Sequence, residues 1–275
     1  MSNNKLFDTL VLDATLPQPP VFSADKMDVF ADGALYFKNH GKRFAAPTTP
    51  MRFQLDEQNF QIVLSSFTIN SLVEAILQTE FLIIPVNHHL LAEFLGFELT
   101  TTLLFAVIPE LFYNYGHKNV SLLVQPISGT TINFSNEKKT AVVHVEALSD
   151  WFVEQNSNDT NSVNVFTSLL SLDLELSIAV NETKFTNVSI TSLNLNGFNV
   201  TKDNLGGSVK SDEVGILYRL QGLLPVIEVS INHLLAGHAI KLPEFQVIDY
   251  TVKFDYQDGA FGTGLMVTPK ASLYQ

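Results

Sequence analysis

Apolar and polar residues alternate through most of the segment from 119 to 200. The clearest stretch is 172–180, where Leu172, Leu174, Leu176, Ile178 and Val180 are separated by Asp173, Glu175, Ser177 and Ala179. A period of two residues places successive side chains on opposite faces of a strand, so these strands are expected to have one apolar and one wet face. The short Asn-, Ser-, Gly- and Lys-rich separators favour an antiparallel meander in one large sheet.

The parity of the apolar positions changes within this segment. Val188 and Ile190 lie at even positions, whereas Leu193 and Leu195 lie at odd ones. One extra residue at that point would form a β-bulge, which bends a strand and increases its twist. We therefore expect the sheet to curl.

Shorter patterns predict the remaining elements. Helical spacing predicts a helix over 67–78, and a second, short helix is expected at 109–115. Strands are expected at 52–65, at 97–105 and, near the C-terminus, at 246–256. Residues 27–37 are expected to form a short strand pair around Asp32-Gly33, inside a proline-punctuated segment that ends near residue 50.

The segment from Asp212 to Ala236 is apolar at helical spacing around most of its circumference. Only Gln221, Glu228 and Asn232 form a polar stripe. A helix of this kind has to be enclosed by protein or lipid, so we expect the curved sheet to wrap it. Pro225 lies within the segment and predicts a kink rather than an end.

Composition limits the functions that the chain can have. The net charge of -12 opposes long-range attraction to nucleic acid and to anionic bilayers, and we find no basic patch that reverses this field. Without cysteine the chain has neither disulfide bonds nor thiolate metal sites.

Glu93, Glu98 and Pro109 interrupt the longest apolar stretch, which argues against a membrane-spanning helix. Asp8 interrupts the apolar run at the N-terminus, so no signal peptide is expected there.

Six Asn-x-Ser/Thr sequons occur in the chain. Asn133 and Asn199 each lie between two apolar strand residues, so their side chains would point away from the apolar face. We interpret the sequons as a sign of export, in a secreted protein or one of the endomembrane lumen whose leader has been removed. Polar strand faces also produce sequons by accident, and that alternative stays open. The candidate glycosylation sites are Asn119, Asn133, Asn158, Asn181, Asn187 and Asn199.

No pattern in the sequence predicts catalysis or metal binding. The string nearest to a nucleophile elbow, 207–211, lacks the second glycine. The adjacent His88 and His89 would diverge on a strand or a helix, and His233 and His238 lack i, i+4 spacing. The glycine-rich string 259–264 is better explained by a hairpin turn than by a phosphate loop. We therefore expect a non-enzyme with no catalytic residue and no metal.

Three collinear segments resemble a known family. They are VFADGALYFKNHGKRF (29–44), ELTTTLLFAVIPELFYNYGHKNVSLLV (98–124) and HLLAGHAIKLPEFQVIDYTVKF (233–254). In this order they are similar to the C-terminal half of the bactericidal/permeability-increasing, lipopolysaccharide-binding and cholesteryl ester transfer proteins. The resemblance implies an α+β fold, the tubular lipid-binding barrel, in which a long, highly curved antiparallel sheet wraps a long kinked helix and a shorter helix. Residues 1–50 would match peripheral strands of the inter-domain sheet and linker, and residues 51–275 the barrel.

The resemblance also implies a function. It leads us to expect non-enzymatic binding, and by extension transfer, of phospholipid or another acyl lipid in an apolar tube between helix and sheet. The expected partners are this lipid, a membrane surface in transient contact and an N-terminal sister domain, but not nucleic acid. No cofactor is expected apart from a bound phospholipid or fatty acid. We place the lipid along Leu217, Leu220, Leu224, Ile227, Ile231, Val73, Ile76, Leu77, Phe97, Leu99 and Leu103.

Two alternatives stay open at this point. One is a structural or protein-interaction module that keeps the same fold with a filled core. The other is a host-defence, endotoxin-binding domain, which rests on family analogy alone. The family's endotoxin recognition resembles a task for basic residues at the tip of the first barrel, which this chain lacks.

Overall fold

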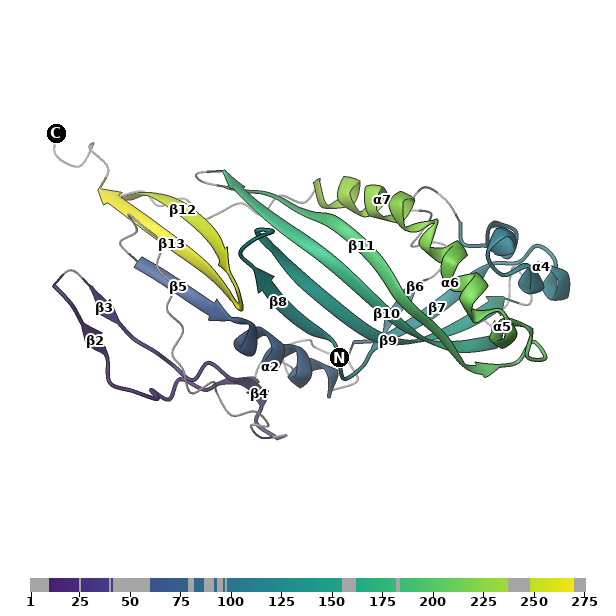
Figure 1. The fold of residues 1–275 in the computed structure, drawn as a ribbon, viewed down its shortest axis with the longest axis horizontal. Helices are drawn as coiled ribbons and strands as arrows, with labels where there is room; N and C mark the ends of the chain where they lie inside the picture. The colour runs from purple at the N-terminus through teal and green to yellow at the C-terminus, as the bar shows by residue number, and fades with distance from the viewer. Residues whose placement is uncertain are drawn as a thin grey trace.

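The large antiparallel sheet dominates the fold (Figure 1). The computed structural model describes residues 10–24, 26–39, 41, 60–78, 82–86, 92, 96, 98–154, 162–181, 184–236 and 248–269. The strands of the large sheet are β6 (Ile84–Val86), β7 (Val120–Pro126), β8 (Thr131–Ser135), β9 (Thr140–Glu154), β10 (Ser162–Asn181) and β11 (Lys184–Asp203). They lie in the order β11-β10-β9-β7-β6, and β8 pairs with β9 beyond the end of β7. The predicted antiparallel meander is confirmed.

The long edge strand β11 is bulged at regular intervals. Its register against β10 shifts four times, and each shift leaves one residue of β11 without a partner: Thr186, Thr191, Asn196 and Thr201. The bulge expected between 190 and 193 is the one at Thr191. Because each bulge adds twist and bend to a strand, the five-residue interval distributes the curvature along the whole length of β11.

Three helices follow β11 in place of the single kinked helix expected over 212–236. They are α5 (Ser208–Ser211), α6 (Glu213–Gln221) and α7 (Leu224–Ala236). The chain bends by 42° between α6 and α7. The break lies at Gly222 and Leu223 rather than at Pro225, because Pro225 is in the first turn of α7, where its missing N–H removes no helical hydrogen bond.

Polar side chains of α6 and α7 cover the free edge of β11. Glu213 Oε1 accepts a hydrogen bond from the N–H of Val200 (2.6 Å), and Gln221 Nε2 donates to the carbonyl of Leu195 (2.8 Å). Asn232 both accepts from the N–H of Ile190 and donates to its carbonyl, each at 2.7 Å. All three strand residues directly precede a bulged residue. The helices therefore satisfy backbone groups that an edge strand would otherwise leave open.

The buried core lies at one end of the large sheet, where helices close it. The closing elements include η1 (Leu103–Ala106), a 3-10 helix, and α4 (Pro109–Tyr115), which confirms the predicted short helix. The core cluster consists of Leu99, Leu104, Val107, Ile108, Leu111, Val120, Trp151, Val153, Val165, Phe166, Phe198, Val200, Val209 and Ile216.

The strand expected at 97–105 is wrong over the part of it that is described. Thr100 forms an isolated bridge with Asn119, and a 3-10 helix begins at Leu103. The hydroxyl of Thr100 accepts a hydrogen bond from the N–H of Leu103, and Thr101 donates its hydroxyl proton to the carbonyl of Gly116. Such bonds between side chains and the backbone compete with strand pairing, and here they override the alternating pattern.

A second sheet lies at the other end of the molecule (Figure 1). It has the order β12-β13-β5, with β5 at Phe60–Ser65, β12 at Ile248–Gln257 and β13 at Ala260–Pro269. The turn at Asp258-Gly259 joins β12 to β13, which confirms a hairpin in the glycine-rich string. Helix α2 (Ser66–Leu77) follows β5 directly, with the Ser65 hydroxyl accepting from the N–H of Thr68 as its N-cap.

The most buried face of α2 is its small, polar face rather than the apolar side on which Ile69, Leu72, Val73, Ile76 and Leu77 recur at helical spacing. Thr68, Ser71 and Ala75 are buried, and Ser71 accepts a hydrogen bond from the N–H of Leu35. A Cβ atom on Gly33 would lie 2.8 Å from the hydroxyl oxygen of Thr68, so the chain approaches α2 too closely for a larger residue. Short side chains are therefore required on this face.

The N-terminal strands do not form the pair expected around Asp32-Gly33. Instead β1 (Leu10–Leu12) pairs with β4 (Leu35–Phe37), and β2 (Val21–Phe22) pairs with β3 (Met27–Asp28). The N–H groups of Asp32 and Gly33 donate to the carbonyls of Thr15 and Asp13, so the Asp-Gly pair contacts an earlier segment. The boundary placed near residue 50 lies outside the described residues and stays a prediction.

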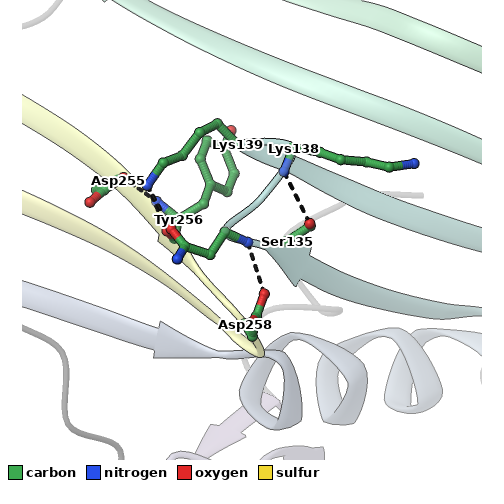
Figure 2. A network of polar contacts seen from close by, with 7 residues as sticks. Ser135, Lys138, Lys139, Asp255, Tyr256 and Asp258 are labelled. Atoms are coloured by element: carbon green, nitrogen blue, oxygen red, sulfur yellow. Dashed lines mark hydrogen bonds and ion pairs between the residues drawn. The ribbon is translucent and has the colours of Figure 1, made fainter.

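The two sheets are joined through the β8–β9 turn (Figure 2). Lys139 Nζ binds Asp255 Oδ1 (2.7 Å) and the carbonyl of Tyr256 (3.2 Å), and the N–H of Asn136 donates to Asp258 Oδ1 (2.9 Å). Lys139 has a left-handed backbone, with φ at 52°. A non-glycine residue in this conformation costs about 1–2 kcal/mol, which the contacts of its ammonium group help to offset.

Candidate functional site

The face of the large sheet that is turned toward α5–α7, here called the inner face, carries mostly apolar side chains, with the buried pair Ser149 and Ser168 among them. Beyond the last core residue of β11, Phe198, three further rows of paired residues run across β11, β10 and β9. These distal rows are Leu195–Leu172–Val145, Leu193–Leu174–Val143 and Ile190–Leu176–Ala141. The inner face therefore continues well past the end of the core cluster.

The distal rows are less covered than the core end. Leu172, Leu174 and Leu176 of β10 are all half-buried, as are Val143 and Val145 of β9. The β11 members Ile190, Leu193 and Leu195 are buried, because α6 and α7 run along that strand. Among the larger side chains of these rows, those of β10 and β9 are thus less covered than those of β11, while Ala141 is buried.

Helix α7 carries half-buried apolar side chains beside these rows. They are Leu224, Ile227 and Ile231. The two hydrogen bonds between Asn232 and the backbone of Ile190 fix the position of α7 along β11. Three of the predicted lipid-binding residues are therefore held close to the distal rows. Leu217 and Leu220 of α6 pack instead against the core cluster.

The other predicted lipid-binding residues lie elsewhere. Leu99 is a buried core residue, and Leu103 is exposed on η1 at the closed end. Val73, Ile76 and Leu77 are half-buried on α2, a helix that packs against β4, β5 and β8. Phe97 lies outside the described residues. The structure thus separates positions that the sequence pattern had grouped around one lipid.

The residues that sequence reasoning left out are those of β9 and β10. The alternation of Leu172 to Leu176 had identified a half-buried strand, but it did not indicate what covers its apolar face. The available signal was the length of that alternation. It extends further along β10 than the helices that close the core.

The described sequons differ in exposure. Asn133 and Asn199 are exposed on the outer face, and the neighbours of Asn199, Phe198 and Val200, are buried as expected. Asn119 is half-buried, and its Nδ2 donates to Glu154 Oε2 at 3.1 Å. Asn158 and the side chains of Asn181 and Asn187 lie outside the described residues.

Among the described strand residues, His144 and Asp173 have shifted pKa values and lie on the outer, wet face. His144 Nδ1 lies 2.6 Å from Asp173 Oδ1, and His144 Nε2 lies 3.0 Å from Glu146 Oε1. The hydrogen bond to Asp173 raises the pKa of His144, and the same bond lowers the pKa of Asp173. Asn196 Nδ2 also donates to Asp173. These bonds join β9, β10 and β11 on the side opposite the helices, where they favour strand pairing.

Within the described part of the chain, no cluster of three or more metal-ligating side chains occurs. His88, His89 and His238 lie outside that part. Of the described helices, none is long and apolar enough by itself to cross a bilayer, whereas the bent pair α6–α7 meets the length and composition requirement.

These observations define an α+β domain built on a large antiparallel sheet, with few helices and an apolar inner face that continues beyond its core. The chain belongs to the LBP / BPI / CETP family: the model of that family's C-terminal domain matches residues 4–253. The resemblance drawn from the three sequence segments is therefore confirmed.

The chain is similar to the crystal structure of lipopolysaccharide binding protein, with 19% sequence identity, a TM-score of 0.42 and coverage of 95% of this chain and 55% of that one. The chain thus spans about half the length of that protein. None of the curated proteins matches it.

Proposed function

We propose that this domain binds an acyl lipid on the inner face of its large sheet and performs no covalent chemistry on it. The observation that carries the proposal is the continuation of the apolar inner face, as half-buried side chains, past the end of the packed core. Membership of a family of lipid-binding proteins supports the same function.

The proposed acyl chains lie along the distal rows, against Leu224, Ile227 and Ile231 of α7. Each methylene group transferred from water to such a surface contributes about 0.8 kcal/mol, so a chain that spans three rows would be held firmly. A lipid there would supply the cover that the middle strands lack. In this proposal the curved sheet, the helix and the lipid together make up the tubular barrel.

The proposal also covers the role of the domain, its compartment and its partner domain. The domain acts as a carrier or sensor of phospholipid or fatty acid in a secretory compartment, and it works beside an N-terminal sister domain. The match to a model of a C-terminal domain supports that arrangement.

A single substitution on α7 tests the lipid position. Ile227→Trp places a larger side chain between α7 and the distal rows, so we expect lipid occupancy to fall severalfold while unfolding stays cooperative. Native mass spectrometry of gently purified protein measures the occupancy. His233→Trp is the matched control, because His233 is exposed on the same helix and its replacement should leave occupancy unchanged.

Two results would contradict the proposal at different levels. Equal lipid occupancy in both tryptophan variants would overturn the placement on α7. A wild-type protein that carries no lipid and takes up no fluorescent fatty acid would overturn lipid binding itself.

The proposed compartment makes a separate prediction about glycans. In protein secreted from eukaryotic cells, we expect Asn133 and Asn199 to be glycosylated, because both are exposed on the outer face. Asn119 should be unmodified, since its amide is bound to Glu154. Intact mass before and after enzymatic deglycosylation measures this, with Asn133→Gln and Asn199→Gln each expected to remove one glycan. A glycan lost on Asn119→Gln would contradict the prediction.

A further inference from the structure

The outward side of the α6–α7 pair is an exposed apolar stripe. Val214 is 81% exposed, Tyr218 78%, Val226 59% and Val229 69%. Val214 and Tyr218 are four residues apart on α6, and Val226 and Val229 are three residues apart on α7, so the two members of each pair lie on one side of their helix. Exposed apolar residues scattered singly are ordinary, but a continuous stripe of them marks an interaction surface.

This stripe carries no formal charge. From Val214 to His233, the exposed side chains that the structure describes are apolar or uncharged, with histidine counted as neutral at pH 7. Of the charged residues nearby, Arg219 pairs with Asp212 and donates to the carbonyl of Val107, Glu213 accepts from the N–H of Val200, and Glu228 is half-buried. An occupant of the stripe therefore gains nothing from carrying charge.

Charge and side-chain type together indicate what kind of surface the stripe meets. The net charge of -12 repels an anionic surface at long range. An apolar helix side with a tyrosine in it suits the boundary between headgroups and acyl chains, where the phenol stays hydrated while the ring is buried. A protein partner of similar size would usually meet a polar rim as well as an apolar centre.

The geometry points to a docking surface for a zwitterionic lipid bilayer, formed by the outward side of α6 and α7. The two helices lie along the bilayer surface with Val214, Tyr218, Val226 and Val229 inserted among the headgroups. This inference rests on the proposed function for its choice of occupant, because a domain that carries an acyl lipid has to meet a lipid surface to load it.

Charged substitutions within the stripe test the docking. Co-sedimentation with phosphatidylcholine vesicles should show binding of the wild-type chain, and Val229→Glu and Val214→Glu should each weaken it by at least about tenfold, because a carboxylate would enter an apolar layer. Both positions are largely exposed, so both variants should keep the wild-type thermal unfolding midpoint. Asn199→Glu adds the same charge on the outer face of β11 and should leave vesicle binding unchanged.

A different occupant of the stripe would give different results with the wild-type chain and the same three variants. Equal vesicle binding by all four proteins, no binding at all, or binding only to vesicles with anionic lipid would overturn the docking surface. So would self-association in analytical ultracentrifugation that Val229→Glu abolishes in the absence of vesicle binding, since a second copy would then cover the stripe. Copurified lipid is measured on each protein by native mass spectrometry. Its presence alongside failed docking overturns this inference and leaves the proposed function standing.

Discussion

Phe166→Ala is expected to lower the free energy of unfolding by about 3–5 kcal/mol. Phe166 is fully buried, at 0% exposure, in the core at the closed end of the large sheet. Its ring stacks on that of Trp151 with centroids 4.9 Å apart, and it meets Phe198 edge-on at 6.2 Å. Truncation leaves a cavity between β9, β10 and β11, which the curved backbone cannot close without losing strand pairing.

Trp151 provides the measurement. It is the only tryptophan of the chain and lies against Phe166, so its fluorescence reports urea unfolding of this core directly. The matched control is Phe105→Ala, since Phe105 is 42% exposed at the same end of the molecule and should cost less than about 1 kcal/mol. If the two variants lost equal stability, this end would not be the packed part of the domain.

Asn232→Leu is expected to lower the free energy of unfolding by about 2 kcal/mol, because it leaves two backbone groups without partners. The amide of Asn232 both accepts from the N–H of Ile190 and donates to its carbonyl. Leucine is close to asparagine in size but can make neither bond. The helix would then dock on β11 through apolar contacts alone, and the edge of the strand would open.

Amide hydrogen exchange locates this effect. Protection of the Ile190 amide should fall in Asn232→Leu, while the amide of Val200, bound by Glu213 further along β11, keeps its protection. His233→Leu changes the neighbouring exposed residue and serves as the control. Unchanged exchange at Ile190 in Asn232→Leu would show that the side-chain contact does not cover the strand edge.

The alternating and helical patterns predicted the elements whose partners are local. The meander of β9, β10 and β11, the helices at 66–77 and 109–115 and the bulge at Thr191 were all evident from the periodicity of apolar residues. Each of these depends on backbone geometry and near neighbours along the chain. The family was also evident, because its three segments keep their order along the chain.

The predictions that were wrong depended on contacts between distant segments or on hydrogen bonds from side chains to the backbone. Asp32-Gly33 has the composition of a hairpin turn, yet its N–H groups bind Thr15 and Asp13. The alternation over 97–105 is overridden by the hydroxyls of Thr100 and Thr101. In α2 the close approach of Gly33 decides which face is buried. Local propensity cannot anticipate any of these, since each energy gain comes from a partner far away in sequence or from a side-chain bond that the pattern does not encode.

Apolar periodicity alone established that the chain holds a long sheet with one apolar face and an apolar helical segment after it. Only the tertiary structure decided which parts of those apolar surfaces are covered. The core closes at the end that η1 and α4–α6 seal, the leucines of β10 and the valines of β9 in the distal rows stay half-buried, and α6–α7 keeps an exposed stripe. The physical reason is that burial depends on what packs against a surface, whereas periodicity reports only which side chains share it.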